Sequence, residues 1–265
     1  MQKDLQLAIE AAIAGGKEIL KVYEGPEIKV EHKEDNSPLT VADKAANDAI
    51  VAFLQTTDHP IISEENKQLD FEVRKSWKTC WIVDPLDGTK EFIKKNGEFT
   101  VNIALCQEGK PTFGVIYVPV SRELYYADVS KSIAYKSVLT KDHNINKDLF
   151  TEEDRIKPSA LDRNLLRIVG SRSHMNQNTI DYIDSVKHDF KNVDIVSKGS
   201  SLKFCLVAEG KADVYPRFAP TMEWDTAAGQ AICNAVGLSV ISQDTNEELL
   251  YNKENLLNPF FLVNK

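Results

Sequence analysis

The chain has 265 residues, of which 42% are hydrophobic, so it can bury a sizeable core in one large domain or two lobes. Its formal net charge of −8 and its pI of about 5.3 argue against broad binding to nucleic acid or to anionic membranes. No apolar run is long enough to span a bilayer and the first residues lack a signal-peptide pattern, so we expect a cytoplasmic protein, with peripheral contact to the cytoplasmic face of the inner membrane left open.

The first half of the chain predicts two helices and then a set of strands. Apolar residues in the range 5–20 have the spacing of an amphipathic helix, and Thr40 with Asp43 resembles a capping pair that opens a second helix. The strands that follow are joined by short turns, which favours an antiparallel meander and an α+β lobe. They comprise residues 99–105, 113–118 and 124–127. In the first of these, polar Thr100 and Asn102 lie between apolar neighbours.

The second half alternates predicted strands and helices, which favours an α/β lobe. The charged stretch 141–157, which has few large apolar residues, either separates two lobes, residues 1–157 and 158–265, or forms an extended surface loop. The predicted strands are 166–169, 193–196, 212–215, 238–241 and 260–263, and the predicted helices are 179–190, 201–209 and 225–236.

The stretch from Trp81 to Thr89 carries the strongest chemical signal. An apolar run predicts a buried strand that ends in Asp84 and Asp87, followed at once by Gly88. Two carboxylates at the edge of a core are costly unless a cation lies between them, and oxygen ligands of this kind suit Mg²⁺. If Thr89 opens a helix, its free N–H groups would hold a phosphate. The stretch therefore indicates metal-assisted chemistry on a phosphate, although both acids also suit ordinary turns.

Further acids stand at the ends of other predicted elements. Glu64 and Glu65 follow a short apolar run, and Asp43 lies in the capping pair of the second helix. Asp225 precedes an Ala-rich helix, where an Asp is usually an N-cap. Each position has an ordinary structural explanation, but four acidic element ends in one chain of this size favour a shared site.

Taken together, these motifs resemble the inositol monophosphatase superfamily of Mg²⁺-dependent, lithium-sensitive phosphatases. The resemblance rests on Glu64-Glu65, on the run from Asp84 to Thr89 and on the run from Trp224 to Gly229, and it extends to Asn258-Pro259-Phe260. It therefore covers nearly the whole chain. It implies a layered αβαβα sandwich, the sugar phosphatase fold.

The resemblance also implies an active site between the two lobes that holds two or three Mg²⁺ ions. Two such ions about 3.5–4 Å apart activate a water and stabilise the leaving oxygen of an in-line displacement. By resemblance, Thr89 relays the proton of the water, Asp43 orients the Thr89 hydroxyl, and Glu64 shares the role of base. The implied metal ligands are the side chains of Glu64, Asp84, Asp87 and Asp225 and the carbonyl of Leu86. Glu65 takes a subsidiary role.

Within the superfamily, residues 199–217 and Ser171-Arg172-Ser173-His174 resemble the bacterial 3'(2'),5'-bisphosphate nucleotidases. The implied reaction is hydrolysis of 3'-phosphoadenosine 5'-phosphate to AMP and phosphate, linked to sulfate assimilation, with 3'-phosphoadenosine 5'-phosphosulfate as a second substrate. Lys203 and Arg217 are the candidates for the second phosphate, and His174 for the adenine or ribose. The remaining implied substrate contacts are Glu64, Leu86, Asp87, Gly88, Thr89, Gly199, Ser200 and Asp225.

Three other functions are weighed against this one. An inositol or sugar phosphate phosphatase on the same scaffold is the nearest alternative, because it shares every metal residue. Haloacid-dehalogenase-type phosphatases have an Asp-x-Asp motif after a strand, whereas Asp84 and Asp87 are three residues apart. A phosphate sensor without catalysis could have lost a metal or relay residue, and none of those proposed here is missing. The sequence leaves the oligomeric state open.

Overall fold

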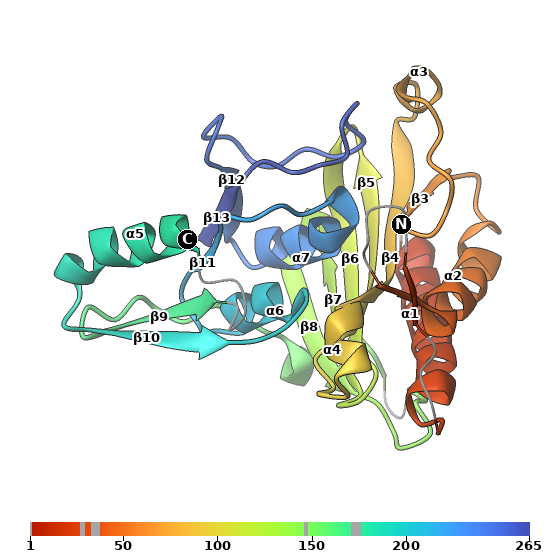
Figure 1. The fold of residues 1–265 in the computed structure, drawn as a ribbon, viewed down its shortest axis with the longest axis horizontal. Coiled ribbons are helices and arrows are strands. Elements are labelled where there is room, and N and C mark those ends of the chain that lie inside the picture. The colour runs from red at the N-terminus through yellow and green to blue at the C-terminus, as the bar shows by residue number, and fades with distance from the viewer. Residues whose placement is uncertain (1, 27–29, 33–37, 146–147, 171–175) are drawn as a thin grey trace.

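A computed structural model describes residues 2–26, 30–32, 38–145, 148–170 and 176–265. Its centre is a six-stranded sheet in the order β3-β4-β5-β6-β7-β8 (Figure 1). The strands are β3 (Ile61–Ser63), β4 (Thr79–Asp87), β5 (Thr100–Gln107), β6 (Lys110–Val118), β7 (Glu123–Asp128) and β8 (Ile133–Val138). β3 and β4 are parallel and all later neighbours are antiparallel. This confirms the predicted meander and adds β8, which the sequence analysis did not identify.

Two long helices cover one face of this sheet. They are α1 (Gln2–Tyr23) and α2 (Val41–Leu54), which pack against each other and against β4, β5 and β6. Their buried faces carry aliphatic residues at helical spacing, among them Ile9, Ile19 and Ile50. α2 begins as predicted, because the Thr40 hydroxyl accepts from the Ala42 N–H and the Asp43 carboxylate accepts from the Thr40 N–H.

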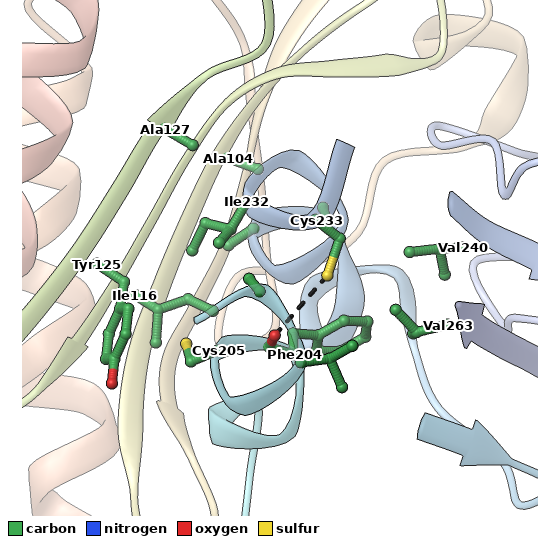
Figure 2. Close-up of a cluster of buried hydrophobic side chains, with 14 of the residues drawn as sticks. Ala104, Ile116, Tyr125, Ala127, Phe204, Cys205, Ile232, Cys233, Val240 and Val263 are labelled. Atoms are coloured by element: carbon green, nitrogen blue, oxygen red, sulfur yellow. Dashed lines mark hydrogen bonds between the residues drawn. The ribbon is translucent and has the colours of Figure 1, made fainter. Parts of the chain in front are cut away.

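The helices α6 (Leu202–Ala208) and α7 (Glu223–Ala235) cover the opposite face. Figure 2 shows their meeting point with the sheet, where Ile116 and Tyr125 point at the two helices. The Cys233 thiol lies 3.8 Å from the carbonyl oxygen of Phe204, so the two helices are in direct contact. The cysteines at 80, 106, 205 and 233 are buried and free.

Beyond these helices lies a second β layer, followed by the outermost helix, α5 (Gln177–Val186) (Figure 1). This layer holds the parallel pair β9 (Leu165–Gly170) and β10 (Asn192–Ser197), and the antiparallel strands β11 (Tyr215–Arg217), β13 (Phe261–Asn264) and β12 (Ser239–Ser242). The order helices, sheet, helices, sheet, helix confirms the expected layered αβαβα sandwich.

Two predicted elements of this layer have different bounds from those expected. The strand predicted at 212–215 begins only at Tyr215, because Val214 pairs with β9 through a single bridge to Ile168 and does not continue the pairing of β11 with β13. The helix predicted at 179–190 ends at Val186 and continues as a short 3₁₀ turn. The remaining short elements are β1 (Val30–His32), β2 (Pro38–Thr40), α3 (Phe71–Arg74), α4 (Thr89–Ile93), η1 (Val129–Lys131), η2 (Glu152–Asp154) and η3 (Lys187–Asp189).

The predicted division at residue 157 stays a proposal. Part of the stretch 141–157 is bound to the edge of the sheet, since the Ile156 N–H donates to the Ala134 carbonyl and the Ser137 hydroxyl donates to Asp154. One hydrophobic core also joins α6 and α7 directly to strands β4–β7. The functional side chains of the two halves are therefore held by a shared core.

α7 lies unusually close to the sheet at Gly114 of β6. A Cβ atom at this position would lie 2.5 Å from the carbonyl oxygen of Ala228 and 2.6 Å from the Cβ of Ala231. Both atoms belong to the helix wall and cannot rotate away. The absent side chain therefore allows the backbone of α7 to rest almost directly on the strand.

We expect Gly114→Ala to lower the free energy of unfolding by roughly 1–3 kcal/mol, because the helix must shift to admit the methyl group. Urea denaturation followed by circular dichroism measures this loss. Gly15→Ala is the matched control, since its Cβ would meet only the movable end of the Ile50 side chain. An equal loss in the two variants would contradict the proposed role of the close helix–strand contact.

Candidate active site

The end of β4 contains a β-bulge that sets the direction of two acids. In a regular strand, residues three apart point to opposite faces of the sheet. Here Asp84 pairs with Asn102 and Asp87 pairs with Thr100, so β4 has one more residue than β5 between these pairs. The bulge lies at Pro85 and Leu86, and it turns both carboxylates toward the same side.

A third carboxylate reaches this side from α7. One oxygen each of Asp84, Asp87 and Asp225 lies within 4.8 Å of the others. Asp225 is the third residue of α7 and not its N-cap, and its Oδ2 accepts from the Met222 N–H at 2.8 Å. Asp84 Oδ1 accepts from the Leu86 N–H at 3.0 Å. Two elements thus hold the three acids, β4 for Asp84 and Asp87 and α7 for Asp225.

The cluster is electrostatically unfavourable without a cation. Burial raises the pKa of Asp84 well above its usual range, and the charges of Glu64, Asp87 and Asp225 raise it further. Burial, together with Asp87, raises the pKa of Asp225 to about 7. Burial also raises the pKa of Asp87, although the Lys203 ammonium and the Ser201 N–H oppose this shift.

These donors fit a hard divalent cation. All of them are carboxylate oxygens, the ligand type that Mg²⁺ prefers, and a bound cation would remove the repulsion that raises their pKa values. Glu64, half-buried at the end of β3, lies close enough to raise the pKa of both Asp84 and Asp225. Glu65 is also half-buried, one residue further along the chain.

Thr89 and Asp43 meet beside the cluster. The Thr89 hydroxyl lies 3.4 Å from Asp43 Oδ1 and 3.4 Å from the Leu86 carbonyl oxygen. Asp43 Oδ2 accepts from both the N–H and the hydroxyl of Thr40, at 2.7 Å each. The capping pair of α2 thereby orients the carboxylate that faces Thr89. Gly88, with φ of 92°, makes the turn from β4 into α4.

Two cationic side chains, Lys203 and Arg217, line a pocket of about 140 Å³ together with Asp87 and Asp225. Lys203 is 6% exposed, so it is not a solvated surface charge, and burial lowers its pKa to about 8. Its ammonium donates to the Ser200 carbonyl at 2.5 Å and lies over the Tyr215 ring. Arg217 lines the same pocket, and its buried Nε has no hydrogen-bond partner. An unsatisfied guanidinium nitrogen beside a lysine suits an anionic ligand.

The loop that carries Gly199 and Ser200 is tied to the first half of the chain by Glu98. The Glu98 carboxylate accepts from the Gly199 N–H at 2.9 Å and from the Lys198 ammonium at 3.2 Å. The Gly199 N–H therefore points at a protein carboxylate, while Gly199 itself lines the pocket, and its substrate contact stays a prediction. Ser200 lines the pocket with a positive φ of 44°. His174 lies outside the described residues.

The structure also adds residues that the sequence analysis did not single out as functional. Glu91 lines the pocket, and its charge acts on Lys203 and Asp87. Asn102 and Ser201 donate to Asp87, at 3.3 and 2.5 Å. The one available signal was the pair of polar residues, Thr100 and Asn102, in an otherwise apolar strand.

Comparison with known proteins establishes the class. Residues 1–259 match the inositol monophosphatase family, and the chain belongs to that family. Two curated relatives, from Salmonella typhimurium and Escherichia coli K12, are each 42% identical to this chain over 263 residues. Each alignment covers 98% of this chain and 98% of the relative. Both bear the name 3'(2'),5'-bisphosphate nucleotidase CysQ.

The solved structures agree with this assignment. The crystal structure of CysQ from Bacteroides thetaiotaomicron is 52% identical in sequence to this chain and superposes with a TM-score of 0.88. The superposition covers 100% of this chain and 97% of the CysQ chain. The suhB protein of Bartonella henselae, 22% identical with a TM-score of 0.74, shares the fold. Among the described residues, no helix has the length and apolarity needed to cross a membrane.

We expect Mg²⁺ to stabilise the protein far more at about pH 8 than at about pH 5. Because the pKa of Asp225 is raised from 3.8 to about 7 on folding, the metal-free folded state binds more protons than the unfolded state between these values. Its free energy of unfolding therefore falls as the pH rises through this range. Mg²⁺ binds the deprotonated carboxylates and offsets the loss at the upper end only.

Differential scanning fluorimetry in EDTA and in MgCl₂ at both pH values measures this effect. NaCl of equal ionic strength controls for general screening. Equal Mg²⁺ shifts of the melting temperature at the two pH values would show that the clustered acids are not its origin.

Proposed function

We propose that this chain is a Mg²⁺-dependent 3'(2'),5'-bisphosphate nucleotidase that hydrolyses the 3'-phosphate of 3'-phosphoadenosine 5'-phosphate to give AMP and phosphate. The observation that carries the proposal is one pocket lined by Lys203 and Arg217 and by two of the three clustered carboxylates, Asp87 and Asp225. The names of its relatives support the same activity. By the same chemistry, 3'-phosphoadenosine 5'-phosphosulfate is a second candidate substrate, which would link the enzyme to sulfate assimilation.

The carboxylates serve to bind and to orient. Glu64, Asp84, Asp87 and Asp225, with the Leu86 carbonyl, would hold two or three Mg²⁺ ions, which when bound supply an activated water and neutralise charge on the transferred phosphate. Thr89 would accept a proton from the attacking water at its hydroxyl oxygen. Asp43, held by Thr40, would fix the direction of that hydroxyl and accept the hydroxyl's own proton as the proton of the water arrives, so that Thr89 stays neutral.

The second phosphate of the nucleotide provides the basis for substrate choice. Its negative charge is repelled by the carboxylates, whereas Lys203 and Arg217, which line the pocket, can bind it. A guanidinium with an unpaired Nε can add a charge-assisted hydrogen bond to a phosphate oxygen. Ser200, which lines the pocket, is a further proposed contact. His174 remains the proposed contact for the adenine or ribose.

An inositol or sugar phosphate phosphatase would use the same acids and is less well supported. The single phosphate of inositol 1-phosphate would lie at the metals, which leaves no phosphate group of the substrate for Lys203 and Arg217. The relatives that cover nearly the whole chain at 42% identity bear the nucleotidase name. A cytoplasmic location stays a proposal that rests on the sequence alone.

Phosphate release, with and without Mg²⁺, should be measured from 3'-phosphoadenosine 5'-phosphate, inositol 1-phosphate and fructose 1,6-bisphosphate. We expect Mg²⁺-dependent release with strong preference for the nucleotide. Preference for either of the other substrates would leave the metal chemistry in place and refute the nucleotide assignment. Release that does not depend on Mg²⁺ would refute the metal assignment.

We expect Asp87→Asn to lower kcat/KM by more than about 100-fold, because it removes the charge of a metal ligand and residues that only support ligands typically contribute 10- to 100-fold. The melting temperature in EDTA should not fall, since the acids repel one another without a cation. Steady-state kinetics and thermal unfolding measure the two effects. Turnover near that of the wild type would rule out Asp87 as a metal ligand.

We expect Lys203→Met to raise the KM for the nucleotide by about 10- to 150-fold, the equivalent of a charged hydrogen bond of about 1.5–3 kcal/mol. The hydrolysis of inositol 1-phosphate, which lacks the second phosphate, should change much less. Lys211→Met is the matched control, because Lys211 is exposed and pairs with Glu209 away from the acids. An equal loss of activity on both substrates would show that Lys203 supports the structure of the pocket and does not select the substrate.

A further inference from the structure

A buried polar network lies behind Asp87, on the side of β5. It consists of Thr100 and Asn102 on β5 and Ser201 at the start of α6, which are 0%, 1% and 2% exposed. Their hydroxyl and amide groups are within hydrogen-bond distance of one another, at 2.7 to 3.0 Å. Buried polar groups in a sheet of apolar residues are costly unless fully paired, so this network calls for an explanation.

The network delivers two N–H donors to one oxygen of Asp87. The Asn102 amide nitrogen lies 3.3 Å from Asp87 Oδ2, and the Ser201 backbone nitrogen lies 2.5 Å from the same atom. The carboxylate is thereby turned so that Oδ2 faces β5 and the loop before α6. In this orientation Oδ1 is the oxygen left for the cluster with Asp84 and Asp225.

The hydroxyl groups determine which end of the Asn102 amide faces Asp87. The Ser201 hydroxyl lies 2.7 Å and the Thr100 hydroxyl 3.0 Å from Asn102 Oδ1, and either can donate to it while the other donates across the 2.8 Å contact between the two hydroxyls. With the amide reversed, its oxygen would face the Asp87 carboxylate without a hydrogen between them. The two hydroxyls thus hold the amide nitrogen toward the acid.

We propose that Asn102 is a positioning residue that aims the Asp87 carboxylate at the metal, with Thr100 and Ser201 holding its amide. The inference rests on the proposed metal role of Asp87. Mg²⁺ requires near-ideal octahedral geometry, so a ligand that rotates freely binds it less well. Groups that orient metal ligands typically contribute 10- to 100-fold in metal affinity or activity.

The test measures metal binding in the absence of substrate. Mn²⁺, which takes the same oxygen ligands and reports its free concentration by electron paramagnetic resonance, is titrated into the wild type and Asn102→Ala. We expect the Kd for Mn²⁺ to rise 10- to 100-fold in Asn102→Ala. The Mg²⁺ concentration for half-maximal turnover should rise by a similar factor.

A double-mutant cycle separates positioning from structure. In the Asp87→Asn background, Asn102→Ala should change the Kd for Mn²⁺ by less than about threefold, because the carboxylate it orients is gone. Ser137→Ala is the control, since Ser137 lies on β8 at the far edge of the sheet, where its buried hydroxyl bonds Asp154 and Tyr126. It should leave Mn²⁺ binding unchanged even where it lowers the melting temperature.

If the Kd for Mn²⁺ is unchanged in Asn102→Ala but rises in Asp87→Asn, this inference is overturned and the proposed metal role of Asp87 stands. An unchanged Kd in Asp87→Asn overturns the proposed metal role and this inference with it. If Asn102→Ala does not fold, Thr100→Val replaces it, because valine keeps the shape and removes one hydroxyl that holds the amide. A Kd for Mn²⁺ that stays at the wild-type value in Thr100→Val would then count against the inference.

Discussion

The mutual repulsion of three carboxylates is the constraint on which the rest of the site depends. Asp84, Asp87 and Asp225 approach within 4.8 Å in a partly buried position, where their charges raise one another's pKa values. Such a cluster forms only if the fold holds each acid firmly. The hydrophobic core supplies that hold, because the sheet and α7 pack together over a long contact and fix the strand and the helix that carry the acids.

Several structural features hold the acids in place. A bulge turns Asp84 and Asp87 to one side of β4, and the first turn of α7 presents Asp225. The loop before α6 binds Asp87 through the Ser201 N–H, and Glu98 in turn binds this loop. Segments separated by more than a hundred residues therefore meet at one carboxylate. This explains how Lys203 and Arg217 come to line one pocket with Asp87 and Asp225.

The sequence predicted much of this arrangement, and the limits of the prediction have physical causes. The acids at the ends of apolar runs carried enough pattern to indicate a shared site, and the layered fold followed from the family resemblance. The direction of Asp87 could not be predicted, because it depends on the register of β4 against β5. The burial of Lys203 was equally hidden, since an isolated lysine in a helix is usually solvated. The polar pair Thr100 and Asn102 was visible in the sequence, but the role of Asn102 was not, because its partner Ser201 lies 99 residues away.

The close contact at Gly114 also has a consequence for the geometry of the acids. No layer of side chains lies between the strand and the α7 backbone there, so the height of the helix above the sheet is set by main-chain atoms. Side chains can change rotamers to absorb strain, whereas main-chain atoms cannot. Asp225 lies three and six residues before the two α7 residues in this contact, Ala228 and Ala231, on the same helix. The absence of a side chain at Gly114 therefore helps to set the distance between Asp225 and Asp84.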